Sequence, residues 1–156
     1  MSYLLDANAF LDLIRQRNIK IKDQYILDLT IYETGNAIWK EHALFKSITL
    51  GEALKLMINI QNIVSKMKVI RIQKDSDKIL EIAFRKHLTF YDAAYLYFAK
   101  KYNLALVTND NKLYNSAKDE EIKVLKSIEF QEQTTKFNCK KLRDKEGNQV
   151  IQNCNI

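Results

Sequence analysis

Residues 88–113 have the sequence LTFYDAAYLYFAKKYNLALVTNDNKL. In the first half of this stretch, small and apolar side chains cover nearly every face of a helix expected over Phe90 to Tyr102. The second half contains the apolar run Leu104 to Val107, which is typical of a buried strand. A buried helix that leads directly into a buried strand indicates a layered α/β fold, because helices then cover the faces of a mostly parallel sheet.

The same alternation of strands and helices extends over the rest of the chain. Short apolar runs predict strands at residues 3–5, 25–29, 69–72, 104–107 and 122–125. Helical spacing of apolar residues predicts helices at about residues 7–14, 31–42, 50–64, 75–86, 90–102 and 111–117. Together these elements predict a three-layer α/β/α sandwich around a mostly parallel sheet.

One folded domain is expected over residues 1–130, because a chain of 156 residues is close to the usual size of a single domain. After about Phe130 the composition shifts to Gln, Asn, Lys and Thr, so residues 131–156 are expected to form a C-terminal tail. Folding residues 136–156 as a β-hairpin would place Cys139 opposite Cys154, within disulfide reach. The alternative is a polar tail with reduced thiols, which a reducing cytosol favours.

The composition excludes several classes of function. Apolar residues make up 47% and charged residues 28%, a globular balance. No apolar run approaches the ~20 residues of a membrane span, and the N-terminus lacks the basic start of a signal peptide, so we expect a cytoplasmic protein without membrane contact. With 3 scattered glycines, the chain has no Gly-rich phosphate loop. Because 2 His and 2 Cys are too few for an ordinary zinc site or a Ser-His-Asp triad, any chemistry must rest on carboxylates.

Four acidic residues take distinctive positions in this predicted fold. Asp6 and Asp110 directly follow strands, whereas Glu33 and Asp92 lie in the first turns of helices. Taken singly, each acid has a structural explanation: the first two suit helix caps, and the other two fit the capping-box pattern with a threonine three residues earlier. Taken together, all four should face one crevice, because the ends of parallel strands and the starts of adjoining helices share one edge of the sheet.

Four carboxylates in one crevice repel each other and need a counter-charge. A divalent cation would supply it, and ligation by oxygen alone suits Mg²⁺ or Mn²⁺ rather than zinc. Such an ion can activate water and stabilise the leaving oxygen of a phosphodiester. The chain as a whole has a net charge of +6, which favours an anionic partner. An acidic pit in a basic protein predicts a nuclease.

The segments around these acids resemble the PIN-domain family, and within it the VapC-type toxins of toxin–antitoxin pairs. The resemblance covers residues 1 to about 128, and it rests on the segments Tyr3 to Asn8, Thr30 to Glu33, Leu88 to Lys100 and Leu104 to Leu113. It implies a metal-dependent endoribonuclease that acts on RNA, forms a homodimer and is inhibited by a protein antitoxin.

The resemblance also implies the residues of the site. It places the catalytic carboxylates around Mg²⁺ or Mn²⁺: Asp6, Glu33, Asp92 and Asp110. Asn8 and Thr108 fall at positions where the family often has supporting polar groups.

Other functions stay open at this point. A PIN-like domain could bind RNA or protein without catalysis, although repelling carboxylates have no use in a pure binding cleft. It could also process RNA without being a toxin, since PIN domains serve in ribosomal RNA maturation and RNA decay. A haloacid-dehalogenase-like phosphatase fits poorly, because it needs a second Asp two residues after Asp6, where this chain has Asn8.

Overall fold

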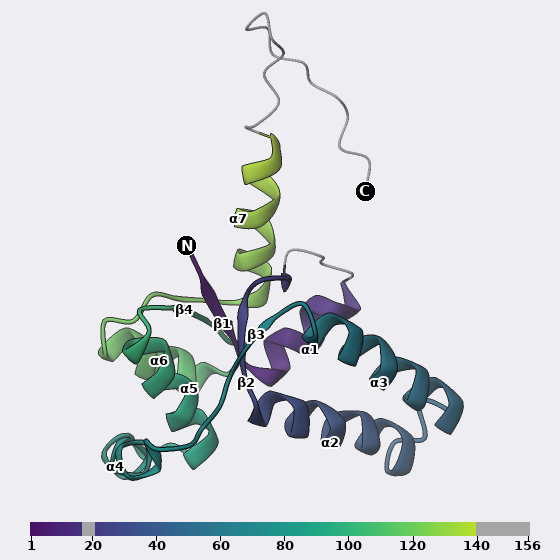
Figure 1. Ribbon diagram of the computed structural model, residues 1–156, viewed down its shortest axis with the longest axis horizontal. Coiled ribbons are helices and arrows are strands. Elements are labelled where there is room, and N and C mark those ends of the chain that lie inside the picture. The colour runs from purple at the N-terminus through teal and green to yellow at the C-terminus, as the bar shows by residue number, and fades with distance from the viewer. Residues whose placement is uncertain (17–20, 140–156) are drawn as a thin grey trace, which may run out of the picture.

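A computed structural model describes residues 1–16 and 21–139, and within them the chain forms a five-stranded, fully parallel sheet (Figure 1). The strand order is β3-β2-β1-β4-β5. The strands are short: β1 (Tyr3–Leu5), β2 (Tyr25–Leu27), β3 (Lys68–Ile70), β4 (Ala105–Val107) and β5 (Val124–Leu125). The predicted α/β sandwich around a parallel sheet is confirmed.

Helices cover both faces of this sheet (Figure 1). One face carries α4 (Ser76–Lys86), α5 (Phe90–Lys101) and α6 (Asn111–Asp119). The other face carries α1 (Ala7–Arg15), α2 (Leu29–Ala43) and α3 (Leu50–Val64), with α7 (Ser127–Cys139) packed beside α1. Among the described helices, none is both long and apolar enough to cross a membrane.

The sheet separates two hydrophobic cores. Leu4 of β1 belongs to the core beneath α4, α5 and α6, whereas its neighbour Leu5 belongs to the core beneath α1, α2 and α3; both are 0% exposed. Successive strand residues point to opposite faces, so a strand covered on both sides must be apolar at every position. Burial of each leucine stabilises the fold by about 1.5–3 kcal/mol.

The second strand ends earlier than predicted. The sequence predicted a strand through Leu29, but β2 ends at Leu27, and the Asp28 carboxylate accepts a 3.0 Å hydrogen bond from the N–H of Leu29. Asp28 therefore caps α2 instead of extending the strand. The capping box at the start of α3 forms as predicted, with Thr49 and Glu52 bonding each other's backbone N–H.

Helix α7 was not predicted. Phe130 is 0% exposed, and its ring meets the edge of Tyr3 at a centroid distance of 4.9 Å, so this turn of the helix belongs to the core. The α7 helix includes residues 136–139, where a β-hairpin was expected to begin. The remainder of that hairpin, with Cys154 as the expected partner of Cys139, lies outside the described residues.

Candidate active site

The carboxyl ends of β1 and β4 form the centre of the candidate site. These strands are neighbours in the sheet, and the chain continues from β1 toward β2 on one side and from β4 toward β5 on the other. Ligands of open parallel sheets bind at such a reversal. The N–H of Asp6, just after β1, donates a 3.0 Å bond to the carbonyl of Val107 at the end of β4. The residues that follow the two strands therefore lie side by side.

Asp6 is enclosed at this edge, with 5% of its surface exposed. Its Oδ1 accepts a 2.6 Å bond from the N–H of Ala9, and its Oδ2 accepts a hydrogen bond from the Thr108 hydroxyl. Burial raises the pKa of Asp6 to about 6, and the charges of Glu33 and Asp110 add to the rise, while both hydrogen bonds oppose it. Asp6 does cap α1 as its position suggested, but the cap leaves its charge under-compensated.

Glu33 is held by a buried phenol. The hydroxyl of Tyr95, a residue 2% exposed, donates a 2.8 Å bond to Oε2 of Glu33 and lies 2.8 Å from Oγ1 of Thr30. The capping-box interpretation of Thr30 and Glu33 is wrong, because Asp28 already caps α2. Burial raises the pKa of Glu33, the charge of Asp92 adds to the rise, and the Tyr95 bond opposes it. Glu33 thus has its partner on another helix rather than at its own helix end.

Asp92 and Asp110 are both bound at helix starts. The Thr89 hydroxyl accepts a 3.1 Å bond from the N–H of Asp92 and donates a 2.7 Å bond to its Oδ2. Oδ1 of Asp110 accepts a 2.7 Å bond from the N–H of Leu113, and the Asp110 N–H donates a 3.0 Å bond to the Thr108 hydroxyl. The buried Thr108 hydroxyl therefore links the Asp110 backbone to the Asp6 carboxylate.

These contacts engage one oxygen on three of the acids: Oε2 of Glu33, Oδ2 of Asp92 and Oδ1 of Asp110. In the part of the chain that the structure describes, no protein donor contacts the second oxygen of these side chains. The charges interact in a chain, from Asp110 to Asp6, from Asp6 to Glu33, and from Glu33 to Asp92. The predicted acids thus lie within electrostatic range of one another. Asn8, which was predicted to support the site, is exposed in the first turn of α1.

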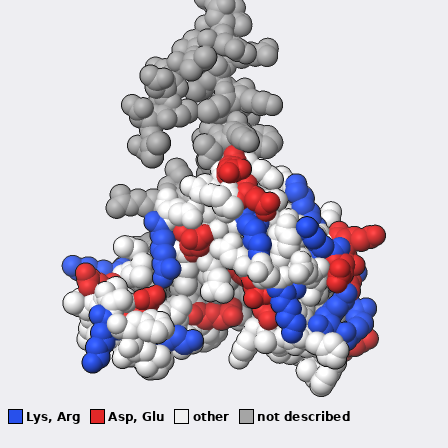
Figure 2. Space-filling view, turned by 180° about the vertical axis from the view of Figure 1, so that it is seen from behind, with Lys and Arg blue, Asp and Glu red and all other residues white. Residues whose placement is uncertain are grey.

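Within the described residues, no three Asp, Glu, His or Cys side chains stand close enough together to hold a metal ion. Each of the four carboxylates already accepts a hydrogen bond from a nearby hydroxyl or backbone N–H. Because like charges repel, the carboxylates do not move closer together without a bound cation. Their free oxygens are nevertheless the donors that Mg²⁺ or Mn²⁺ prefers. Figure 2 shows acidic side chains on both sides of the recess between the two groups of helices, with Lys and Arg side chains further out.

The sequence of this chain is similar to those of known proteins. Residues 3–119 match the model of the PIN domain. The chain belongs to the PIN-domain family. The match ends before β5 and α7, so these two elements of this PIN domain lie beyond the matched region.

Several relatives of this PIN domain are named or solved. It is 37% identical over 121 residues to Exonuclease VapC9 of Pyrobaculum aerophilum, which covers 76% of this chain and 87% of that protein. It is 29% identical over 92 residues to Ribonuclease VapC3 of the same organism. This alignment covers 59% of this chain and 70% of that protein. The crystal structure of PAE2754 from P. aerophilum has a TM-score of 0.71 at 33% identity, covering 83% of this chain and 86% of that one. A toxin–antitoxin complex from Klebsiella pneumoniae shares the fold, with a TM-score of 0.54 at 21% identity. The match covers 72% of this chain and 90% of that chain.

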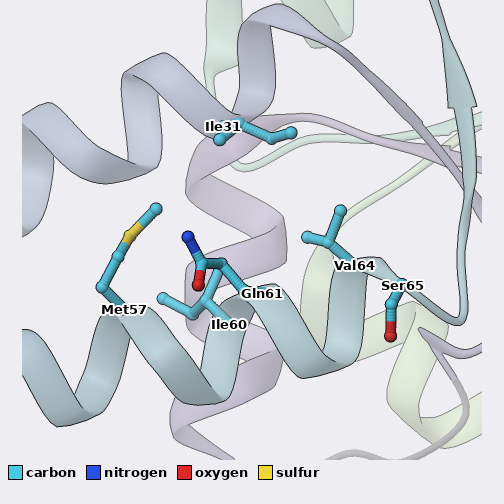
Figure 3. A pocket seen from close by; sticks show the side chains of 6 residues that line it. All are labelled: Ile31, Met57, Ile60, Gln61, Val64 and Ser65. Carbon is cyan, nitrogen blue, oxygen red and sulfur yellow. The ribbon is translucent and has the colours of Figure 1, made fainter.

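An apolar hollow of this PIN domain lies between α2 and α3 (Figure 3). Its walls carry aliphatic, amide and hydroxyl side chains: Ile31, Met57, Ile60, Gln61, Val64 and Ser65. Because no carboxylate lines it, this hollow takes no part in the predicted chemistry.

Tyr95 is a further residue of the candidate site in this PIN domain. Its ring is buried in the core, and its hydroxyl reaches Glu33, 62 residues away along the chain. Tyr95 follows Asp92 by three residues, so the two share a helix face. Since a buried tyrosine hydroxyl usually finds a partner, this spacing is the sequence signal that could have assigned Tyr95 to the site.

Proposed function

We propose that this PIN domain is a metal-dependent endoribonuclease, in which Asp6, Glu33, Asp92 and Asp110 bind Mg²⁺ or Mn²⁺ and hydrolyse RNA phosphodiester bonds. The observation that carries the proposal is that these acids lie within electrostatic range of one another at the strand reversal. Burial raises the pKa of Asp6 to about 6, and the charges of Glu33 and Asp110 add to the rise. Helix capping would need no such coupling between separate helices. A cation bound among the acids would relieve it.

The side chains around the acids orient them without neutralising them. Thr108, Tyr95 and Thr89 each donate a hydroxyl hydrogen bond, to Asp6, Glu33 and Asp92 respectively. Because these donors are neutral, the negative charge stays available to a cation, which is how outer partners of metal ligands act in general. A bound divalent ion would lower the pKa of a coordinated water and stabilise the leaving oxygen.

The surroundings of the acids favour a nucleic acid as substrate. The net charge of the chain is +6, and Lys126 lies at the Asp110 loop, where its Nζ is 3.0 Å from the carbonyl of Asn109. Lysines beside an acidic pit can hold the phosphate backbone while the pit acts on one linkage. The relatives named Ribonuclease VapC3 and Exonuclease VapC9 support nuclease activity in this chain.

We also propose that this ribonuclease is the toxin of a toxin–antitoxin pair. The VapC names of both relatives and the VapC-like segments around the acids support it. The proposal includes a protein antitoxin, a homodimer and a cytoplasmic location. The alternatives are an RNA-processing nuclease that is not a toxin and a non-catalytic RNA- or protein-binding domain.

The relative named an exonuclease makes exonucleolytic cleavage a second candidate. The full chain is incubated with linear and with circularised RNA of one sequence, in Mn²⁺, in Mg²⁺ and in EDTA. An endoribonuclease cuts the circle, whereas an exonuclease cuts the linear form alone. We expect a cut circle with either metal and intact RNA in EDTA. Intact RNA throughout, with no binding of Mn²⁺ by calorimetry, would favour the non-catalytic domain.

A further inference from the structure

The loop between β4 and α6 is tied to the start of α7 through Asn109. The side-chain amide of Asn109 meets Ser127 at two points: its Nδ2 donates to Oγ of Ser127 over 3.1 Å, and its Oδ1 accepts from the Ser127 N–H over 3.1 Å. Two bonds from one planar amide to one residue fix the position and the orientation of the Asn109 side chain. Because Asn109 directly precedes Asp110, this pairing also restrains the Asp110 backbone.

A carboxylate from α1 completes the cluster. The Ser127 hydroxyl donates to Oδ2 of Asp12, and Nδ2 of Asn109 reaches the same oxygen at 3.4 Å. Ser127 is 3% exposed, so its hydroxyl relies on these two side chains rather than on water for its hydrogen bonds. We call Asn109, Ser127 and Asp12 the Asn109 clamp.

Lys126 holds the same loop beside the Asn109 clamp. Its Nζ donates to the carbonyl of Asn109 over 3.0 Å and to Oδ1 of Asn111 over 2.9 Å, and it stands 4.6 Å from the centroid of the Tyr114 ring. The residues before and after Asp110 are therefore both bound by the segment that opens α7. A displacement of this segment would move the Asp110 carboxylate.

A purely structural role does not account for the contacts of the Asn109 clamp. The sheet already fixes the base of the loop, where the N–H of Thr108 donates a 3.0 Å bond to the carbonyl of Leu125, and Asp110 already caps α6. Asn109 stands between Thr108, whose hydroxyl binds Asp6, and Asp110. The Asn109 clamp therefore adds its contacts between these two site residues. Ser127 lies beyond residues 3–119, so the clamp depends on a segment outside the matched PIN region.

We propose that the Asn109 clamp positions Asp110 for cation binding, so that the start of α7 completes the metal site. This inference rests on the proposed function, since it takes Asp110 as a metal ligand. Asn109, Ser127 and Asp12 are positioning residues that act through Asp110.

The test is Mn²⁺ binding to the full chain by calorimetry, without RNA. Ser127→Ala is compared with wild type and with Ser65→Ala, a control serine whose hydroxyl bonds the carbonyl of Asn62 at the end of α3. We expect Ser127→Ala to weaken Mn²⁺ binding about 10-fold, as loss of an outer partner of a metal ligand does, and Ser65→Ala to bind as wild type does. Asn109→Ala serves as the second variant, because Asn109 is exposed and its truncation spares the core.

A double-mutant cycle assigns the effect to Asp110. In an Asp110→Asn background, Ser127→Ala should cause no further loss of Mn²⁺ affinity, because the residue through which it acts is already altered. A full 10-fold loss in that background would overturn the assignment. Wild-type affinity in folded Ser127→Ala and Asn109→Ala would overturn the Asn109 clamp and leave the proposed function standing. Failure of the wild type itself to bind Mn²⁺ would overturn both.

Discussion

The hydroxyl of Tyr95 donates a 2.8 Å hydrogen bond to Oε2 of Glu33, joining α5 to α2 across the candidate site. Tyr95→Phe removes this donor while keeping the ring that fills the core. We expect a 10- to 100-fold loss of RNA cleavage and of Mn²⁺ affinity, because Glu33 loses the partner that orients it. Stability should fall by about 1–2 kcal/mol, because Thr30 also loses its partner.

The matched control for this change is Tyr97→Phe on the same helix. Tyr97 donates a 2.9 Å bond to Asp75, which is not one of the predicted site acids. Cleavage and Mn²⁺ affinity should stay at the wild-type level in this variant. Equal losses in both tyrosine variants would mean that Tyr95 serves the fold and not Glu33.

Asp92→Asn should leave the metal-free protein as stable as wild type, or more stable by about 0–1 kcal/mol. The charge of Asp92 raises the pKa of Glu33, so its removal relieves repulsion, and asparagine can still accept the Thr89 bond. Thermal unfolding in EDTA measures this. Added Mn²⁺ at 100 times its dissociation constant should stabilise wild type by about 2.7 kcal/mol and the variant by less. A large loss of melting temperature in EDTA would identify Asp92 as a structural cap.

The raised pKa of Asp6 makes stability depend on pH in a defined direction. Burial raises this pKa from 3.8 to about 6, so between those values the folded protein binds a proton that the unfolded chain does not. The contribution of Asp6 is therefore most favourable at low pH and is lost as pH rises toward about 6, by about 2–3 kcal/mol in total. Denaturant unfolding in EDTA, from pH 4 to 7, compares wild type with Asp6→Asn, which cannot titrate.

In that comparison, wild type should lose stability relative to Asp6→Asn as the pH increases. Titrating groups that do not interact with Asp6 are common to both proteins and cancel in the difference. If the difference stayed constant over this range, or if wild type gained on the variant, the carboxylate of Asp6 would not be the under-compensated charge described above.

Phe130→Ala should destabilise the protein by about 3–5 kcal/mol, because it opens a cavity in the core beneath α7. Phe130 is 0% exposed against the Tyr3 ring, whereas Ile128, two residues earlier on the same helix, is 55% exposed. Ile128→Ala is therefore the control, with an expected change within about 0.5 kcal/mol. Denaturant unfolding of both variants measures the difference. Similar small changes would show that α7 contributes no core packing.

The sequence predicted the sheet and most helices because their signals are local. Apolar runs such as Leu104 to Val107 indicate buried strands wherever they occur, and the Thr49 capping box marks its helix start directly. Helix α7 escaped prediction because its polar residues lack a clear apolar face, and its place depends on Phe130 meeting Tyr3 at the other end of the chain.

The candidate site shows the same division between local and distant signals. The positions of Asp6 and Asp110 follow from strand order and from the rule that parallel strands end at one edge. The Tyr95 bond to Glu33 and the Ser127 bond to Asp12 join residues far apart in sequence, and no local pattern specifies such partners. Sequence reasoning therefore named the acids together with Thr108 and Thr89, and it missed Tyr95 and Ser127.

The most direct test of the account is the initial rate of RNA cleavage as a function of Mn²⁺ concentration, for wild type, Asp92→Asn and Asp77→Asn. Asp77 is the first-turn acid of α4, as Asp92 is of α5, so its variant controls for the loss of a carboxylate at a helix start. We predict a rate that saturates with Mn²⁺ in wild type and Asp77→Asn, vanishes in EDTA, and falls at least about 100-fold in Asp92→Asn. Cleavage by Asp92→Asn at the wild-type rate, or cleavage by wild type in EDTA, would contradict a metal-dependent carboxylate site.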